Sequence, residues 1–133
     1  AVGTTSLRTM ESIYWLGVKL IEGLLGEAWT LEQWEMYDLD DSINYKESLQ
    51  AIVRWMQENK REQLHCRTSM IIVPGYRFNI PSGIITNFHQ PQSTLLLLIA
   101  AFIGEDWRKI YQHALENDYR FLSYGDSSLL WRD

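Results

Sequence analysis

Cysteine is almost missing from this 133-residue chain, in which Cys66 stands alone. A single thiol excludes an intrachain disulfide scaffold and a cysteine-based zinc site, and it suits the reducing cytoplasm. Long hydrophobic runs are missing as well: the longest, residues 95–103, has nine residues, whereas a helix that spans a bilayer needs about 20. Because no signal peptide is recognisable either, we expect a cytoplasmic protein without a membrane-spanning helix.

Basic residues are also scarce, since 12 Lys and Arg stand against 17 Asp and Glu, for a net charge of −5. This balance argues against a nucleic-acid-binding surface built by this chain alone. Aromatic residues, by contrast, make up 13% of the chain and hydrophobic residues 46%. That content excludes a disordered protein and is enough for the core of one domain over residues 1–133.

The chain opens on Ala1, Val2 and Gly3, without a methionine, in a pattern typical of the last residues of a strand. We therefore expect a piece of a longer protein. A turn at residues 3–6 then leads into a long amphipathic helix, with Thr5 or Ser6 as its cap and an end near Gly26. Gly17 and Gly23 weaken that helix, which favours close packing against another backbone.

The remaining elements follow from periodicity, caps and turn residues. Asn44, with Glu47 three residues on, predicts the start of a second helix, residues 95–103 predict a buried helix, and Asp106 and Asn117 predict the two ends of a fourth. Strands are expected at residues 34–39, at 70–73, in a hairpin over 76–88 and just before Ser123. This order predicts the α/β class, or a mixed α+β fold, with helices packed on a mixed sheet that includes a β-hairpin.

Three polar segments are candidates for chemistry. The first is the turn at residues 3–8, where backbone N–H groups, the hydroxyls of Thr4, Thr5 and Ser6, and the guanidinium of Arg8 suit a carboxylate or phosphate. It lacks the Gly-Lys-Ser/Thr ending of a P-loop. The plainer interpretation is an ordinary helix start with Arg8 in solvent.

The second segment, residues 87–94, joins a strand to the very apolar helix. His89 can act there as an acid or base near neutral pH. Alternatively, Asn87 and His89 satisfy backbone groups of the turn while Ser93 caps the helix.

The third segment, residues 123–128, places Tyr124 and Asp126 around a glycine, which indicates either a turn or a ligand-binding loop. The turn is the simpler interpretation. His65 and Cys66 lack partners at metal-ligand spacing, so no metal site is expected, and His113 falls on the polar side of its helix.

Four segments in order, however, resemble one family. Residues 1–12 (AVGTTSLRTMES), 74–78 (PGYRF), 85–96 (ITNFHQPQSTLL) and 119–126 (YRFLSYGD) are similar to signatures of the S-adenosylmethionine:tRNA ribosyltransferase-isomerases of queuosine biosynthesis. The resemblance covers only the C-terminal part of those enzymes. It implies part of a larger α/β barrel-like domain, in which residues 27–67, with their helix, exceed the family's usual link and form a lineage-specific insertion.

The resemblance also implies a reaction. S-adenosylmethionine donates its ribosyl group to the aminomethyl-deazaguanine base at the wobble position of a tRNA with a GUN-type anticodon. Adenine and methionine leave, and the ribosyl unit rearranges to give epoxyqueuosine, with no metal. His89 is then the candidate for a proton transfer, Thr4, Thr5, Ser6 and Arg8 for holding an anionic group, and Asn87, Ser93, Tyr124 and Asp126 for binding substrate.

Two other hypotheses stay open on the sequence. An isolated C-terminal domain could bind or scaffold without activity by itself, because the rest of the active site lies in the upstream remainder of the same polypeptide. An unrelated α/β nucleotide-binding enzyme is the other hypothesis, and the four ordered motifs argue against it. Apolar surface exposed on such a piece favours a homodimer.

Overall fold

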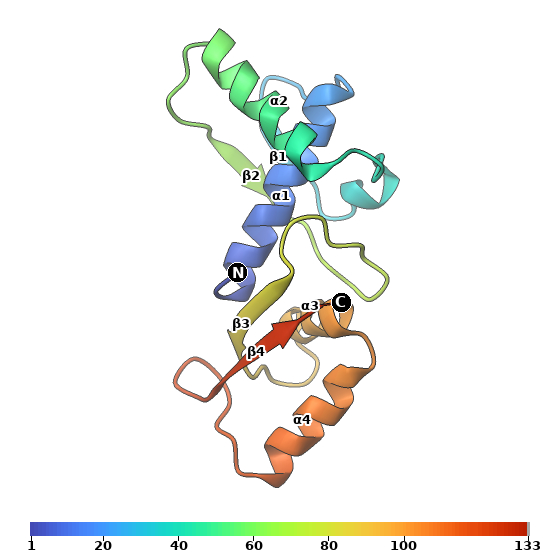
Figure 1. Ribbon diagram of the computed structural model, residues 1–133, viewed down its shortest axis with the longest axis vertical. Helices are drawn as coiled ribbons and strands as arrows, with labels where there is room; N and C mark the ends of the chain where they lie inside the picture. Colours follow the sequence, from blue (N-terminus) through green and yellow to red (C-terminus); the bar gives the residue numbers. More distant parts are fainter. Residues whose placement is uncertain (133) are drawn as a thin grey trace. The chain divides into compact units, whose positions relative to one another are not determined.

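The computed structural model describes residues 1–132 and divides the chain into two compact units (Figure 1). The first unit combines residues 1–8 with the chain from residue 71 onward, and the second holds residues 9–70. Between residues 1 and 132, every helix is too short or too polar to cross a bilayer.

The first unit is built around strand β3 (Gly83–Asn87). Strand β4 (Ser127–Trp131) pairs with it antiparallel, with Leu129 opposite Ile85. On the other side of β3, residues 1–3 run parallel to it, because the Gly3 N–H donates to the Ile85 carbonyl over 2.8 Å and the Ile85 N–H donates to the Ala1 carbonyl over 2.9 Å. The sheet is therefore mixed, which confirms the expected α/β class with a mixed sheet.

Two helices complete this unit, α3 (Thr94–Ile103) and α4 (Asp106–Glu116). Ser93 caps α3 by accepting from the Leu96 N–H, and Gly104 ends it at a φ of 62°. Asn117 ends α4 as predicted, but Asp106 is already helical and Glu105 holds the cap position. The core contains Ile84, Leu98, Ile99 and Phe102, all at most 2% exposed. The very apolar run thus becomes the buried helix that the sequence predicts.

The predicted hairpin over residues 76–88 is wrong. Residues 76–80 form no strand, and the partner of β3 is β4, some 40 residues further along the chain. The alternation that resembled a strand has another cause: Tyr76 and Phe78 are both buried, and their rings meet edge to face at 5.0 Å. An irregular segment that inserts every second side chain into a core has the same period as a strand.

Two further predicted strands are also absent from their predicted positions. Residues 70–73 form no strand, although Met70 and Ile72 are buried. The last strand follows the loop at residues 119–126 and does not precede Ser123. In both cases the local apolar content was right and the backbone pairing was not.

Helix α1 (Thr4–Ile21) starts and ends earlier than predicted. Thr4 is already helical, so neither Thr5 nor Ser6 is the cap. The helix stops before Gly23, whose φ of 70° lies in the left-handed region that ends helices, and so it does not reach Gly26. The prediction overshot because the apolar period continues through Leu24 and Leu25.

The second unit packs α2 (Tyr45–Glu58) against the later part of α1. Asn44 caps α2 as predicted, accepting from the Lys46 N–H. The expected close approach holds at Gly17, where an added Cβ would stand 2.5 Å from the Ser48 carbonyl oxygen, but not at Gly23. The Ser48 hydroxyl donates to the Tyr14 carbonyl over 2.6 Å. The glycine therefore allows two helices to touch at their backbones.

A short parallel pair completes the second unit: β1 (Trp29–Leu31) lies beside β2 (Cys66–Thr68), with Trp29 opposite Cys66. The strand predicted at residues 34–39 is wrong, because this region forms the 3-10 helix η1 (Glu35–Asp38). The Glu35 carboxylate accepts from the Glu32 N–H and pairs with the buried Lys19 ammonium at 2.6 Å. These contacts fold the chain into a turn where an extended strand was expected.

Candidate functional site

The three polar segments predicted from the sequence leave or enter the sheet of the first unit at the same edge. Residues 1–3 and β3 are parallel, so the segments that follow them start side by side. Strand β4 is antiparallel and begins there, because Ser127 lies opposite Asn87. We call residues 3–8, 86–94 and 120–128 the polar edge. Ligands of open α/β sheets bind at the carboxyl ends of parallel strands, which is where this edge lies.

His89 is held at the polar edge by two contacts. Its Nε2 lies 3.1 Å from the Thr86 hydroxyl, and its backbone N–H donates to the Tyr111 hydroxyl over 3.0 Å. Thr86 is itself buried, and its carbonyl accepts from the Ser128 hydroxyl. The imidazole is thus anchored through one nitrogen, while Nδ1 has no hydrogen-bond partner among residues 1–132.

The charge state of His89 follows from its partial burial. Desolvation lowers the pKa of the imidazole below its ordinary value of 6.5. Burial also raises the pKa of Tyr111, while the N–H of His89 lowers it. Near neutral pH the His89 side chain is therefore neutral and able to accept a proton, and the Tyr111 hydroxyl stays protonated.

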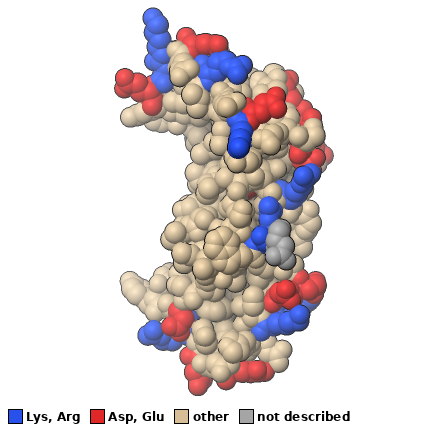
Figure 2. Space-filling view, viewed as in Figure 1, with Lys and Arg blue, Asp and Glu red and all other residues tan. Residues whose placement is uncertain are grey.

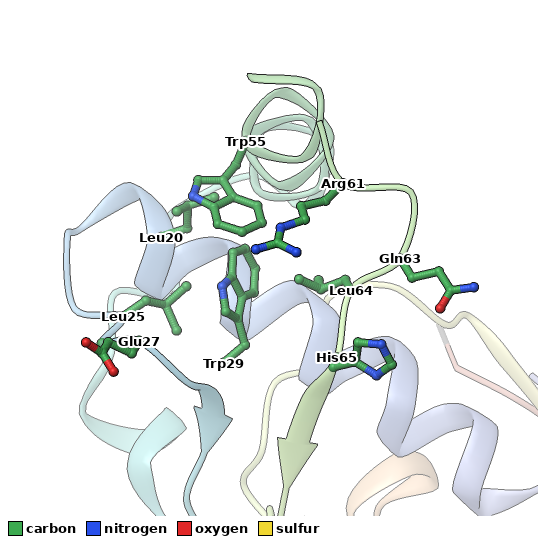
Figure 3. A pocket seen from close by; sticks show the side chains of 10 residues that line it. Leu20, Leu25, Glu27, Trp29, Trp55, Arg61, Gln63, Leu64 and His65 are labelled. Carbon is green, nitrogen blue, oxygen red and sulfur yellow. The ribbon is translucent and has the colours of Figure 1, made fainter. Parts of the chain in front are cut away.

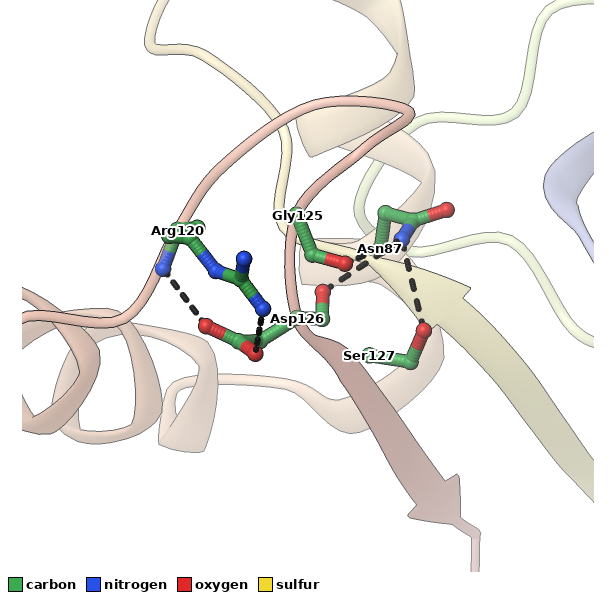
Figure 4. A network of polar contacts seen from close by, with 5 residues as sticks. All are labelled: Asn87, Arg120, Gly125, Asp126 and Ser127. Atoms are coloured by element: carbon green, nitrogen blue, oxygen red, sulfur yellow. Dashed lines mark hydrogen bonds and ion pairs between the residues drawn. The ribbon is translucent and has the colours of Figure 1, made fainter.

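Asn87 connects β3 to the loop that precedes β4 (Figure 4). Its Nδ2 approaches the carbonyl oxygens of Gly125 and Asp126 at 3.4 Å and the Ser127 hydroxyl at 3.3 Å. Figure 4 shows the amide oxygen pointing away from this loop. The amide nitrogen of Asn87 therefore holds the loop, while its oxygen is directed elsewhere.

Asp126 closes the same loop. Its carboxylate accepts from the Arg120 N–H over 2.7 Å and lies 3.4 Å from the Arg120 guanidinium. The backbone hydrogen bond from Arg120 is the main reason that the pKa of this carboxyl lies below its ordinary range. Tyr124 stands at the tip of the loop and is 98% exposed. The loop is a folded turn that presents one tyrosine to solvent.

The remaining predicted residues lie at two helix starts. Ser93 caps α3. In the first turn of α1, Thr4 is buried whereas Thr5 and Ser6 are exposed. The Nε of Arg8 is buried and has no hydrogen-bond partner in the described part of the chain. A buried guanidinium N–H without an acceptor is costly, and a guanidinium can bind an anionic group.

Two residues of the polar edge, Thr86 and Arg120, and one that contacts it, Tyr111, do not stand out in the sequence. Thr86 lies inward on β3, Tyr111 belongs to the apolar stripe of α4, and Arg120 sits in a short motif. Tyr111 could have been found from the sequence, because it is a tyrosine on the apolar face of a helix and its buried hydroxyl needs a hydrogen-bond partner. Thr86 and Arg120 carried no such signal.

Neither the charge on the face seen in Figure 2 nor a cluster of metal ligands among residues 1–132 marks a site. On the face seen in Figure 2, acidic and basic side chains are interspersed, without a broad patch of one sign. Within residues 1–132, no group of three or more His, Cys, Asp or Glu side chains is arranged to hold a metal ion. The polar edge therefore depends on hydrogen-bonding side chains, one imidazole and one unpaired arginine.

Comparison with known proteins now decides the family. A family model described as "Queuosine biosynthesis protein" matches residues 1–130. The chain belongs to this family. Queuosine biosynthesis proteins similar to it include the S-adenosylmethionine:tRNA ribosyltransferase-isomerase of Phenylobacterium zucineum, which is 59% identical over 66 residues, covering 49% of this chain and 18% of that protein. The protein of the same name from Acidiphilium cryptum is 38% identical over 133 residues, covering 99% of this chain and 27% of its own length.

The fold agrees with that of a solved S-adenosylmethionine tRNA ribosyltransferase. The crystal structure of S-adenosylmethionine tRNA ribosyltransferase from Thermotoga maritima shares 31% identity with this chain at a TM-score of 0.58. The match covers 97% of this chain and 31% of that one. The matches to the two curated relatives named above cover 18% and 27% of their lengths, so this chain corresponds to only part of each.

Proposed function

We propose that this protein is part of a transferase-isomerase that modifies tRNA in queuosine biosynthesis. In the proposed reaction, the ribosyl group of S-adenosylmethionine passes to the amine of the aminomethyl-deazaguanine base at the wobble position. The ribosyl carbon–adenine and carbon–sulfur bonds break, adenine and methionine leave, and the ribosyl unit closes to the epoxy-cyclopentane of epoxyqueuosine. Family membership supports the reaction class, and the convergence of three predicted segments at the polar edge is the single observation that supports the location.

His89 is the residue proposed to transfer a proton. The sulfonium of S-adenosylmethionine acidifies the neighbouring C–H, so a neutral base can start the rearrangement, and the departing adenine needs an acid. The lowered pKa of His89 keeps the imidazole neutral, and its Nδ1 is not engaged by the described part of the chain. A neutral imidazole with a free ring nitrogen suits the general base better than the general acid, so we assign His89 to removal of the proton next to the sulfonium.

The start of α1 is proposed to hold an anion. The N–H groups of a first helical turn attract negative charge, and the buried Nε of Arg8 lacks an acceptor. Together with the hydroxyls of Thr4, Thr5 and Ser6, Arg8 would bind the methionine carboxylate or a tRNA phosphate. A planar guanidinium is well matched to either group.

The other predicted substrate-binding residues take more specific positions. Asn87 keeps its amide oxygen available, and exposed Tyr124 offers an aromatic face to a tRNA base. Asp126 and Ser93 are engaged in closing their loop and capping α3, so we propose that they shape the site. The tRNA substrate is proposed to carry a GUN-type anticodon, and residues 27–67 are proposed to be a lineage-specific insertion.

Replacing His89 by Ala in the whole protein tests the catalytic assignment. We expect adenine release from S-adenosylmethionine, measured with precursor-bearing tRNA, to fall by about 100-fold or more. The matched control is His113→Ala, which removes an exposed imidazole of α4 and leaves the rate unchanged. Adenine release by His89→Ala at the wild-type rate would contradict the role of His89.

A second function is favoured by one observation, the 18% and 27% coverage of the two relatives. We propose that the 133-residue chain, assayed by itself, binds without catalysing, because the rest of the active site lies in the remainder of the polypeptide. Adenine release measured in parallel with the whole protein and with this chain tests the proposal. Turnover by the chain alone would exclude it.

A further inference from the structure

A cavity in the second unit lies outside the polar edge. It measures about 460 Å³ and opens between the end of α1, the end of α2 and the β1–β2 pair (Figure 3). Its lining combines nonpolar side chains, Leu20, Leu25, Trp29, Trp55 and Leu64, with polar ones, Glu27, Arg61, Gln63 and His65. We call it the tryptophan pocket. None of these residues takes part in the proposed reaction.

Two indoles form the aromatic part of the tryptophan pocket. The rings of Trp29 and Trp55 are 4.8 Å apart between centroids and tilted by 59°. Trp29 is 7% exposed and fixed in β1, whereas Trp55 on α2 is half-buried and keeps part of its face open to the cavity. A fixed indole that supports an accessible one is a platform on which a flat ring can stack.

The polar side chains of the pocket have no hydrogen-bond or ion-pair partner among residues 1–132. Within residues 1–132, the side chains of Arg61, Gln63, His65 and Glu27 make no hydrogen bond or ion pair, although all four face or border the same cavity. Figure 3 shows the Arg61 side chain pointing toward the two indoles. This set combines a cation, an amide, an imidazole and a carboxylate around an aromatic platform.

A second depression continues the tryptophan pocket along β2. It measures about 340 Å³, shares Glu27, Trp29 and His65 with the pocket, and extends to Arg67. The open surface therefore has a guanidinium at each end, Arg61 and Arg67, although the chain as a whole has a net charge of −5. A local excess of arginine on an acidic protein points to an anionic ligand.

We propose that the tryptophan pocket binds one nucleotide of a single-stranded segment of the tRNA substrate. The base stacks on Trp55, its amino or ring N–H groups donate to Glu27, and Arg61 binds the adjacent phosphate, with Arg67 toward the next one. Aromatic side chains, an arginine and hydrogen-bonding groups for the base edge are the means by which proteins bind unpaired RNA. The inference rests on the proposed function for the identity of the RNA, but not for the chemistry of the pocket.

The chemistry favours RNA over a protein segment. A peptide would have to supply a ring, a carboxylate and an N–H donor from separate groups, and each side chain among them would lose rotamer freedom on binding. A nucleotide instead supplies a flat ring for the indole, a phosphate for the guanidinium and N–H donors for the carboxylate. The two charged groups of the pocket, Arg61 and Glu27, then each acquire a partner of the opposite kind.

The binding test uses the 133-residue chain and a fluorescently labelled single-stranded RNA of seven nucleotides, measured by anisotropy. We expect Arg61→Gln and Trp55→Ala each to raise the dissociation constant by about tenfold. Arg54→Gln, an exposed arginine of α2 outside the pocket, is the matched control and changes it less than about twofold. The slope of log affinity against log salt falls by about 1 for Arg61→Gln. Because Trp55 packs on Trp29, circular dichroism checks that Trp55→Ala is folded, and Arg61→Gln tests the pocket without altering that contact.

The outcomes separate this proposal from the proposed function. In the whole protein, Arg61→Gln raises the KM for tRNA and leaves the rate of adenine release at saturating tRNA unchanged. Equal affinities of wild type, Arg61→Gln and Trp55→Ala for the RNA overturn the nucleotide pocket, even if the whole protein releases adenine normally. Failure of the whole protein to release adenine overturns the proposed function. If RNA binding is then still weakened only in Arg61→Gln and Trp55→Ala, nucleotide binding by the tryptophan pocket is supported all the same.

Discussion

At the scale of single residues, His89 shows how a common side chain acquires a particular protonation state. The backbone contact to Tyr111 and the ring contact to Thr86 hold the imidazole in partly buried surroundings. Tyr111 belongs to α4 and Thr86 to β3, so two regular elements fix the position of the imidazole ring. Burial then lowers its pKa, because the charged form loses hydration.

The lowered pKa of His89 predicts a pH dependence of stability. As the pH falls below about 6.5, the unfolded chain takes up a proton at this imidazole before the folded chain does, so the free energy of unfolding decreases. His89→Gln removes this contribution, and its urea midpoint falls less than that of the wild type between about pH 7 and about pH 5. A wild-type midpoint that falls no further than that of His89→Gln would count against a buried neutral imidazole.

At the scale of elements, the contact between α1 and α2 in the second unit depends on Gly17, which has no side chain. Gly17 lies against the backbone of Ser48, so α1 and α2 approach more closely than any larger residue allows. The Ser48 hydroxyl uses this proximity to donate to the Tyr14 carbonyl, and the Tyr14 hydroxyl donates to the Ile43 carbonyl just before α2. The contact therefore specifies both the distance between the helices and their register.

Gly17→Ala tests this contact against helix propensity. In an open helix the change would stabilise by about 1 kcal/mol. Here the new Cβ would lie 2.5 Å from the Ser48 carbonyl oxygen and 2.8 Å from its carbon, and backbone atoms cannot move aside. We expect a net loss of about 1–3 kcal/mol in the free energy of unfolding by urea. Gly26→Ala, where no atom lies within 4 Å of the new Cβ, stays within about 0.5 kcal/mol of wild type. An equal response of the two variants would refute the close contact.

At the scale of the whole molecule, the outer face of the β3–β4 sheet is apolar. Ile85 and Leu129 lie opposite each other, and Val2 is bridged to Ile85 on the other side. These three side chains and Trp131 are between 43% and 71% exposed. Four exposed apolar side chains on neighbouring strands form a contiguous face, which soluble monomers usually cover.

We therefore expect the 133-residue chain to self-associate through this face. Sedimentation velocity is expected to show a dimer that increases with concentration, and Leu129→Lys to shift it to monomer, because a charge cannot be buried in such a contact. Leu115→Lys is the matched control: that leucine of α4 is 68% exposed but lies outside the face, so the dimer persists. A wild-type chain that sediments as a monomer at every concentration would rule this interface out.

Local signals predicted two helix starts correctly, at Asn44 and Ser93, but not the caps of α1 and α4. Asn44 and Ser93 cap the helices that the sequence assigned to them, because each accepts a hydrogen bond from an N–H two or three residues ahead. The family motifs likewise lie within short stretches, and the match over residues 1–130 confirms them. The alternation at Tyr76 and Phe78 led to a wrong strand prediction, because a local pattern gives no information about which segment pairs with it.

The sequence by itself therefore determined the family, the mixed α/β class, the four helices and the identity of the polar segments. Only the tertiary structure decided that β3 pairs with β4 and with residues 1–3, that the three segments meet at one edge, and that Trp29 and Trp55 form a pocket. The physical reason is the range of the interactions. A cap or a helical stripe forms within a few residues, whereas strand pairing and pockets require distant segments to meet, and many partners of similar apolarity compete for each strand.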